Sequence, residues 1–153
     1  MDQPRYDEGD WPIVLVSLPK EDLDRAKLLQ HVEQLTAFTR RGRPYVQIID
    51  VRGSNSLNAE ARRVVVERMD QDEETHPGIL LGVAMVLATP MHRGIFKAIS
   101  WLTRTPRPFE AFSEIDDAKV WARDLIARTP ASQTMRVSSN AGQAALAKRA
   151  GER

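Results

Sequence analysis

The chain of 153 residues contains no cysteine. This absence excludes disulfide bonds, thiolate catalysis and zinc sites built on thiolates. A surplus of charge of one sign is also missing, because basic and acidic residues nearly balance and leave a formal net charge of +1. A dedicated nucleic-acid-binding protein needs a clear excess of lysine and arginine on one face, so we expect no nucleic-acid partner.

Long hydrophobic runs are missing as well. The longest apolar run, at residues 79–88, is about half the length that a membrane-crossing helix requires, which predicts no stable membrane insertion. The N-terminal residues are acidic and lack the basic and then apolar layout of a secretory signal. Together these absences predict a soluble, cytoplasmic protein.

The patterns that are present alternate between strand and helix. We expect strands at residues 12–18, 45–51, 79–88 and 108–112, and a short antiparallel partner strand at 6–11. We expect amphipathic helices at residues 21–41, 58–72 and 91–103, and a last helix that begins near residue 113. The fold class is therefore α/β, with a single-layer, mixed but mostly parallel sheet of four to five strands and about four helices.

Several local signals refine this arrangement. Asn58 is a suitable N-cap for the second helix, and Ser113 with Asp116 resembles a capping box before the last helix. Gly82, inside an otherwise apolar strand, predicts that a neighbouring element packs closely against it. The segment at 108–112 is flanked by proline, which is tolerated at the edge of a sheet and not in its centre, so this strand should lie on an edge.

The predicted helix at 91–103 has an apolar stripe on one side and basic residues on the other. Met91 belongs to the apolar stripe and Arg93 lies opposite it, so Met91 should face inward. Trp101 lies at the boundary between the two sides, where it either packs under a neighbouring loop or contacts a protein partner or an anionic membrane surface. The candidate partner-contact face consists of Lys97, Trp101 and Arg104.

Two loops should leave the carboxyl ends of strands, which is where parallel sheets favour ligands. One loop spans residues 52–56 and the other spans 89–93. If their strands are neighbours, hydroxyl, amide and guanidinium groups meet beside two helix N-termini, an arrangement that suits an anion. The alternative is that the hydroxyl groups only cap helices and the arginines are solvated. The candidate binding surface consists of Arg52, Ser54, Ser56, Thr89, His92 and Arg93.

No spacing indicates a catalytic or metal centre. Asp50 has no partner carboxylate, and hydrogen bonding within its loop is its expected role. The three histidines, which share no ligand spacing, stand on different predicted elements. We therefore expect no metal and no cofactor, and an enzyme is the least favoured function.

The order of elements and the segment at 109–122 resemble the STAS superfamily, and more closely its bacterial SpoIIAA-like branch. That branch ends in a short strand, an acidic cap and an Ala-x-x-Trp helix. The matching positions are Phe109, Phe112, Glu114, Asp116, Asp117, Ala118 and Trp121. The resemblance spans roughly residues 6–128 and implies a βα superhelix. Residues 1–128 would form one domain, and the composition of 129–153 predicts a flexible, basic tail.

The resemblance also implies a non-enzymatic regulatory domain with a protein partner. STAS antagonists bind a kinase or an anti-sigma factor, and phosphorylation of a serine at the start of the helix after the second main strand switches them. Ser54 and Ser56 fall at that place, although the loop lacks the Asp-Ser pair followed by glycine that is usual in the family. A phospho-switch on this loop is thus an expectation from the resemblance.

A function from a different class stays open. Relatives of this fold are grouped with CRAL-TRIO-type lipid binders, and residues 79–102 are rich in aliphatic side chains and end in a basic stretch. A small-ligand or lipid-binding module would need an apolar cavity of roughly 300 Å³ or more. A short edge strand and a basic helix face also predict a weak homodimer.

Overall fold

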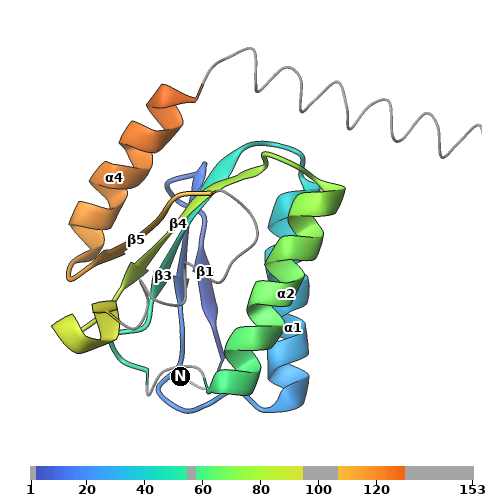
Figure 1. The fold of residues 1–153 in the computed structure, drawn as a ribbon, viewed down its shortest axis with the longest axis vertical. Coiled ribbons are helices and arrows are strands. Elements are labelled where there is room, and N and C mark those ends of the chain that lie inside the picture. The colour runs from blue at the N-terminus through green and yellow to red at the C-terminus, as the bar shows by residue number, and fades with distance from the viewer. Residues whose placement is uncertain (1–2, 55–57, 95–106, 130–153) are drawn as a thin grey trace, which may run out of the picture.

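The structure is a computed structural model that describes residues 3–54, 58–94 and 107–129. The strands are β1 (Arg5–Asp7), β2 (Ile13–Ser17), β3 (Tyr45–Asp50), β4 (Leu80–Val86) and β5 (Phe109–Phe112). The helices are α1 (Arg25–Arg40), α2 (Ala59–Thr75) and α4 (Ile115–Arg128), and residues 90–94 are also helical. Figure 1 shows their arrangement. Most of the helix expected at 91–103, and nearly all of the tail expected at 129–153, lie outside the described residues.

The described strands form one sheet in the order β1-β2-β3-β4-β5. β1 runs antiparallel to β2, whereas the other neighbouring pairs are parallel. The predicted α/β class and the mixed, mostly parallel sheet are confirmed. β5 lies on an edge of the sheet, as the prolines around it predicted.

Helices cover both faces of the sheet (Figure 1). α1 and α2 pack side by side over one face, and α4 packs on the other against β4 and β3. The face under α1 and α2 buries the larger apolar cluster, which includes Val14, Phe38 and Tyr45. The face under α4 buries a smaller cluster that includes Ile48 and Ala118. The inner strands β3 and β4 contribute to both clusters, which explains why their sequences show little polar alternation.

Side-chain caps begin the first two helices. The carboxylate of Asp24 accepts a hydrogen bond from the backbone N–H of Lys27, and the amide oxygen of Asn58 accepts one from Ala61, each at 2.8 Å. These bonds satisfy N–H groups that lack a partner in the first helical turn. The N-cap role of Asn58 is confirmed. α1 begins later than expected, because Asp24 supplies its cap.

The capping box predicted before the last helix is wrong. The N-cap residue of α4 is Glu114, and its side chain makes no capping hydrogen bond. Ser113 lies one residue too early, in the bend that joins β5 to the helix. Asp116 and Asp117 lie in the first turn instead, where their charges complement the positive end of the helix dipole.

Gly82 has the close neighbour that its position in an apolar strand predicted. A Cβ atom at this position would lie 2.6 Å from Cδ2 of Leu125 and 3.0 Å from the Trp121 ring. It would also lie 3.1 Å from the carbonyl oxygen of Pro108. The 2.6 Å approach is closer than real Cβ atoms show, so a larger residue at position 82 would force Leu125 to shift, and glycine lets α4 lie directly on β4.

Candidate functional site

The loops that follow the parallel strands meet at the carboxyl end of the sheet. β3 and β4 are parallel neighbours, with Asp50 opposite Val86. The backbone N–H of Val51 donates to the carbonyl of Val86 at 3.1 Å, and that of Leu87 donates to the carbonyl of Phe112 at 2.9 Å. The loops after β3, β4 and β5 therefore stand next to one another.

Arg52 is held by two carboxylates from these loops. Its guanidinium donates to both oxygens of Asp50, at 3.1 and 3.2 Å, and to Oε2 of Glu114 at 3.5 Å. The hydrogen bond to Asp50 raises the pKa of Arg52 above its ordinary value. Arg52 therefore ties the loop after β3 to the start of α4, and its charge is already compensated. Asp50 acts as a hydrogen-bond acceptor within its loop, as expected.

The loop after β4 is ordered by a helix cap. Oγ1 of Thr89 accepts a hydrogen bond from the backbone N–H of His92 at 3.2 Å, and the carbonyl of Thr89 accepts one from Arg93 at 3.2 Å. The Arg93 guanidinium folds back and donates to the carbonyl of Leu87 at 3.2 Å. Both arginines of the candidate binding surface thus have protein partners, which makes this end less suited to an anion than the sequence indicated.

Met91 does not face inward, so that expectation is wrong. Its side chain is 73% exposed, whereas Arg93 on the opposite side of the same turn is half-buried. The reason is positional: residues 90–94 lie beyond the carboxyl end of β4 and not over a face of the sheet (Figure 1). A large apolar side chain therefore projects into solvent beside the exposed His92.

The remaining predicted residues divide between described and undescribed parts of the chain. Ser54 is half-buried, and its backbone N–H closes a tight turn by donating to the carbonyl of Val51 at 3.0 Å. Ser56 lies outside the described residues. The candidate partner-contact face of Lys97, Trp101 and Arg104 also lies outside them.

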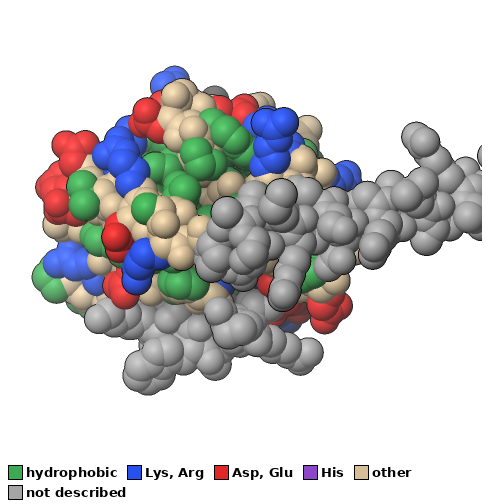
Figure 2. Space-filling model, turned by 90° about the horizontal axis from the view of Figure 1, so that it is seen from above, with side chains coloured by type: hydrophobic (Ala, Val, Ile, Leu, Met, Phe, Trp, Pro, Cys, Tyr) green, Lys and Arg blue, Asp and Glu red, His purple; other side chains and the backbone are tan. Residues whose placement is uncertain are grey.

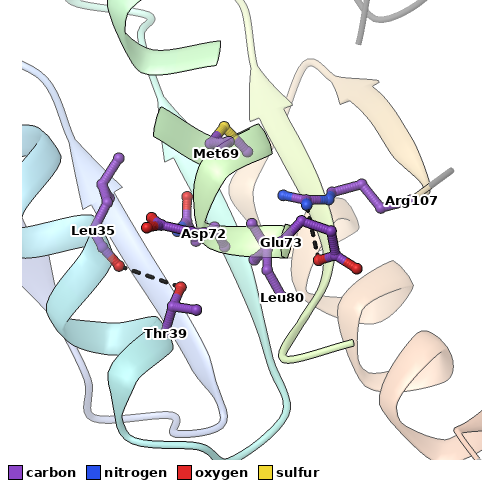
Figure 3. A pocket seen from close by; sticks show the side chains of 8 residues that line it. Leu35, Thr39, Met69, Asp72, Glu73, Leu80 and Arg107 are labelled. Atoms are coloured by element: carbon purple, nitrogen blue, oxygen red, sulfur yellow. Dashed lines mark hydrogen bonds and ion pairs between the residues drawn. The ribbon is translucent and has the colours of Figure 1, made fainter. Parts of the chain in front are cut away.

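At the opposite end of the sheet the structure shows a buried polar cluster that the sequence analysis missed (Figure 3). Arg107 precedes β5, and its guanidinium pairs with Oε2 of Glu73 on α2 at 3.0 Å. The Arg107 side chain is only 5% exposed, and this burial lowers its pKa. Burial likewise raises the pKa of the nearby Asp72 carboxyl, which accepts a hydrogen bond from Thr36 at 2.8 Å. The cluster therefore links the start of β5 to α2, which lies over one face of the sheet.

An open groove of about 460 Å³ lies at the same end, between the turn that precedes β2 and the last turns of α4. Figure 2 looks onto this end and shows hydrophobic side chains gathered near its middle, with basic and acidic side chains around them. Trp11, Pro12 and Ile126 line the groove, together with Asp10 and Arg123. The groove exceeds the volume that a lipid binder needs, but it is open to solvent and lies outside residues 79–102.

Two further observations concern the described part of the chain, residues 3–54, 58–94 and 107–129. Within it, no three His, Asp or Glu side chains are grouped so that they could hold a metal ion. None of the helices found there has the length and apolar character needed to span a membrane.

Comparison with known proteins places the fold. Neither a family model nor a curated protein matches the sequence. Among solved structures, a Shewanella loihica protein with a SpoIIAA-like fold matches with a TM-score of 0.58 and 16% identity, over 78% of this chain and 91% of that one. The anti-sigma factor antagonist SpoIIAA in its unphosphorylated form matches with a TM-score of 0.55 and 12% identity, over 82% and 99% of the two chains.

An anti-sigma factor antagonist from Mycobacterium paratuberculosis matches with a TM-score of 0.53 and 18% identity, over 80% of this chain and 94% of that one. Each of the three structures matches over about four-fifths of this chain. The chain therefore has the SpoIIAA-like α/β fold, and the resemblance found in the sequence is confirmed at the level of the fold.

Proposed function

We propose that this protein is a non-enzymatic regulatory domain that binds a protein partner through the carboxyl end of its sheet. The proposed docking surface consists of Arg52, Ser54, Thr89, Met91 and His92, and we call it the carboxyl-end surface. The observation that carries the proposal is the exposed Met91 on a capped, hydrogen-bonded turn. Similarity in fold to anti-sigma factor antagonists supports a regulatory role.

The chemistry of this surface favours a protein over a small anion. An anion site needs cationic groups and free N–H donors, but Arg52 is already paired with Asp50 and Glu114. Protein interfaces instead combine an apolar side chain at their centre with charged groups at their rim. Methionine suits such a position because it is flexible and adapts to the shape of a partner.

The same loop gives the proposal a route to regulation. A phosphate on Ser54 or Ser56 would add about −1.5 to −2 charges close in sequence to Arg52. It would compete with Asp50 and Glu114 for the guanidinium and so loosen the link between the loop after β3 and the start of α4. Phosphorylation would thereby change the surface presented to a partner without entering the hydrophobic core.

The test is a matched pair of variants. The full-length protein captures its partner from native cell extract, and binding of the purified partner is then measured for Met91→Asp and Val120→Asp. Both positions carry exposed apolar side chains, 73% exposed at Met91 and 63% at Val120, but Val120 lies on the outer face of α4. We expect M91D to weaken binding at least tenfold, because it places a charge at the centre of the interface, whereas V120D binds normally.

Thermal melts of both variants show whether the fold is intact. Equal loss of binding in the two variants, or normal binding by M91D, would contradict the proposed surface. The weak homodimer and the cytoplasmic location stay predictions. Size-exclusion chromatography with light scattering tests the homodimer, and a monomer at high concentration would exclude it.

A further inference from the structure

A directional chain of hydrogen bonds runs through the buried polar cluster at the amino end of the sheet. Nε2 of Gln47 donates to the hydroxyl of Tyr45 at 3.0 Å, and that hydroxyl lies 3.0 Å from Oγ1 of Thr39. Oγ1 of Thr39 in turn donates to the carbonyl of Leu35 at 3.5 Å. A carbonyl only accepts and each hydroxyl has one hydrogen to give, so the chain runs from Gln47 to Leu35.

This direction fixes the orientation of the Gln47 amide. The amide must present Nε2 to Tyr45, which turns Oε1 away from the chain. Gln47 is only 1% exposed, and its Oε1 has no hydrogen-bond partner among the residues that the structure describes. Nε of the buried Arg107 lacks one within the same part of the chain. Each such buried group destabilises the folded state if it stays unsatisfied.

Gln47 and Arg107 line the same small cavity, which has a volume of about 10 Å³. Figure 3 shows the cavity between α1, α2 and the sheet, with Met69 and Leu80 among its apolar walls. Asp72 and Glu73 contribute its two carboxylates. The cavity thus combines one acceptor and one donor that need partners with room for about one water molecule.

We propose that this cavity binds a single structural water molecule that bridges Oε1 of Gln47 and Nε of Arg107. Water can donate to the amide oxygen and accept from the guanidinium at once. An ammonium ion could not accept a hydrogen bond, and an anion could not donate one and would be repelled by Asp72 and Glu73. The bridge connects β3 to Arg107, and the Arg107–Glu73 pair continues the link to α2.

Two measurements on the full-length protein test this proposal. A crystal structure at a resolution that shows ordered water should contain one water molecule within hydrogen-bond distance of Oε1 of Gln47 and Nε of Arg107. Magnetic relaxation dispersion of water nuclei counts long-lived internal water in solution. We expect Gln47→Met to contain one fewer than the wild type, because it keeps the size of the side chain but removes the hydrogen-bond acceptor. Gln34→Met, the same change on α1 at a partly exposed position, should leave the count unchanged.

The proposal is wrong if the crystal structure shows Oε1 of Gln47 in direct contact with Nε of Arg107, or density without water between them. An unchanged count in a folded Q47M protein would also overturn it. If Q47M does not fold, the wild-type crystal structure decides the question alone.

Discussion

The two ends of the sheet use ionic groups in opposite ways. At the amino end, Arg107 and Glu73 form a pair in which the arginine is 5% exposed, and neighbouring polar side chains are linked beneath α1 and α2. At the carboxyl end, Arg52 pairs with Asp50 and Glu114 near the surface, where the arginine side chain is 35% exposed. Removing one partner of a buried ion pair lowers the free energy of unfolding strongly, whereas removing an exposed one changes it little. The amino end therefore suits a structural role and the carboxyl end a binding role.

The largest effect should come from breaking the buried pair. Arg107→Ala leaves Glu73 without its partner and removes the side chain that links β5 to α2. Loss of one partner of a buried ion pair costs about 3–5 kcal/mol, and we expect about 3 kcal/mol here because Glu73 is partly exposed. Urea unfolding measures the change, and R107A combined with Glu73→Ala should recover part of it. A loss below about 1 kcal/mol would mean that the amino end is no more structural than the carboxyl end.

A second large effect should appear as a pH dependence. His31 is 3% exposed, and its Nδ1 forms a hydrogen bond of 2.6 Å with the Tyr6 hydroxyl. Burial lowers the pKa of His31 from 6.5 to about 4. Between these two pH values the unfolded chain binds a proton that the folded chain does not, so stability falls as pH falls from 6.5 to 4. The loss from this histidine should reach about 3 kcal/mol.

The exposed His92 at the carboxyl end provides the matched control. The free energy of unfolding is measured against pH for His31→Gln and His92→Gln. We expect H31Q to lose most of the slope between pH 6.5 and 4, and H92Q to keep it. Equal slopes in the two variants would show that another group causes the pH dependence.

The smallest effect should come from the exposed pair at the carboxyl end. Arg52→Ala removes hydrogen bonds to Asp50 and Glu114, but solvent screens these charges, and exposed ion pairs contribute about 0–1 kcal/mol. We therefore expect a change of at most about 1 kcal/mol in urea unfolding, together with weaker partner binding. If R52A destabilised the protein as much as R107A, the contrast between the two ends would be lost.

Much of the fold could be predicted from the sequence, because its signals are local. Asn58 precedes an amphipathic run and therefore predicts the start of a helix. Gly82 interrupts a continuous apolar strand and therefore predicts an element packed closely against it. The buried pair could not be found this way, because Arg107 and Glu73 are 34 residues apart and meet only through the order of the strands. Gln47 within an apolar strand was the one available signal of a buried polar cluster.

The candidate site was harder to predict, for a geometric reason. A helical wheel assumes that a helix lies over a face of the sheet, but the turn that carries Met91 lies beyond the end of β4. The sequence also could not show that Asp50 and Glu114 compensate the charge of Arg52, since Glu114 follows β5 and is 62 residues from Arg52 in the sequence. The sequence therefore predicted which loops meet at the site, but it did not predict that Met91 is exposed or that Arg52 is paired.

Hydrogen exchange of the protein with and without its captured partner tests directly whether the carboxyl end of the sheet is the binding surface. We expect slower amide exchange on binding in residues 51–54 and 87–94, which form the loops at the carboxyl end. Exchange in residues 41–45 and 75–80, at the amino end, should not change. Slower exchange at the amino end with no change at the carboxyl end would show that the partner binds elsewhere and that the proposed surface is wrong.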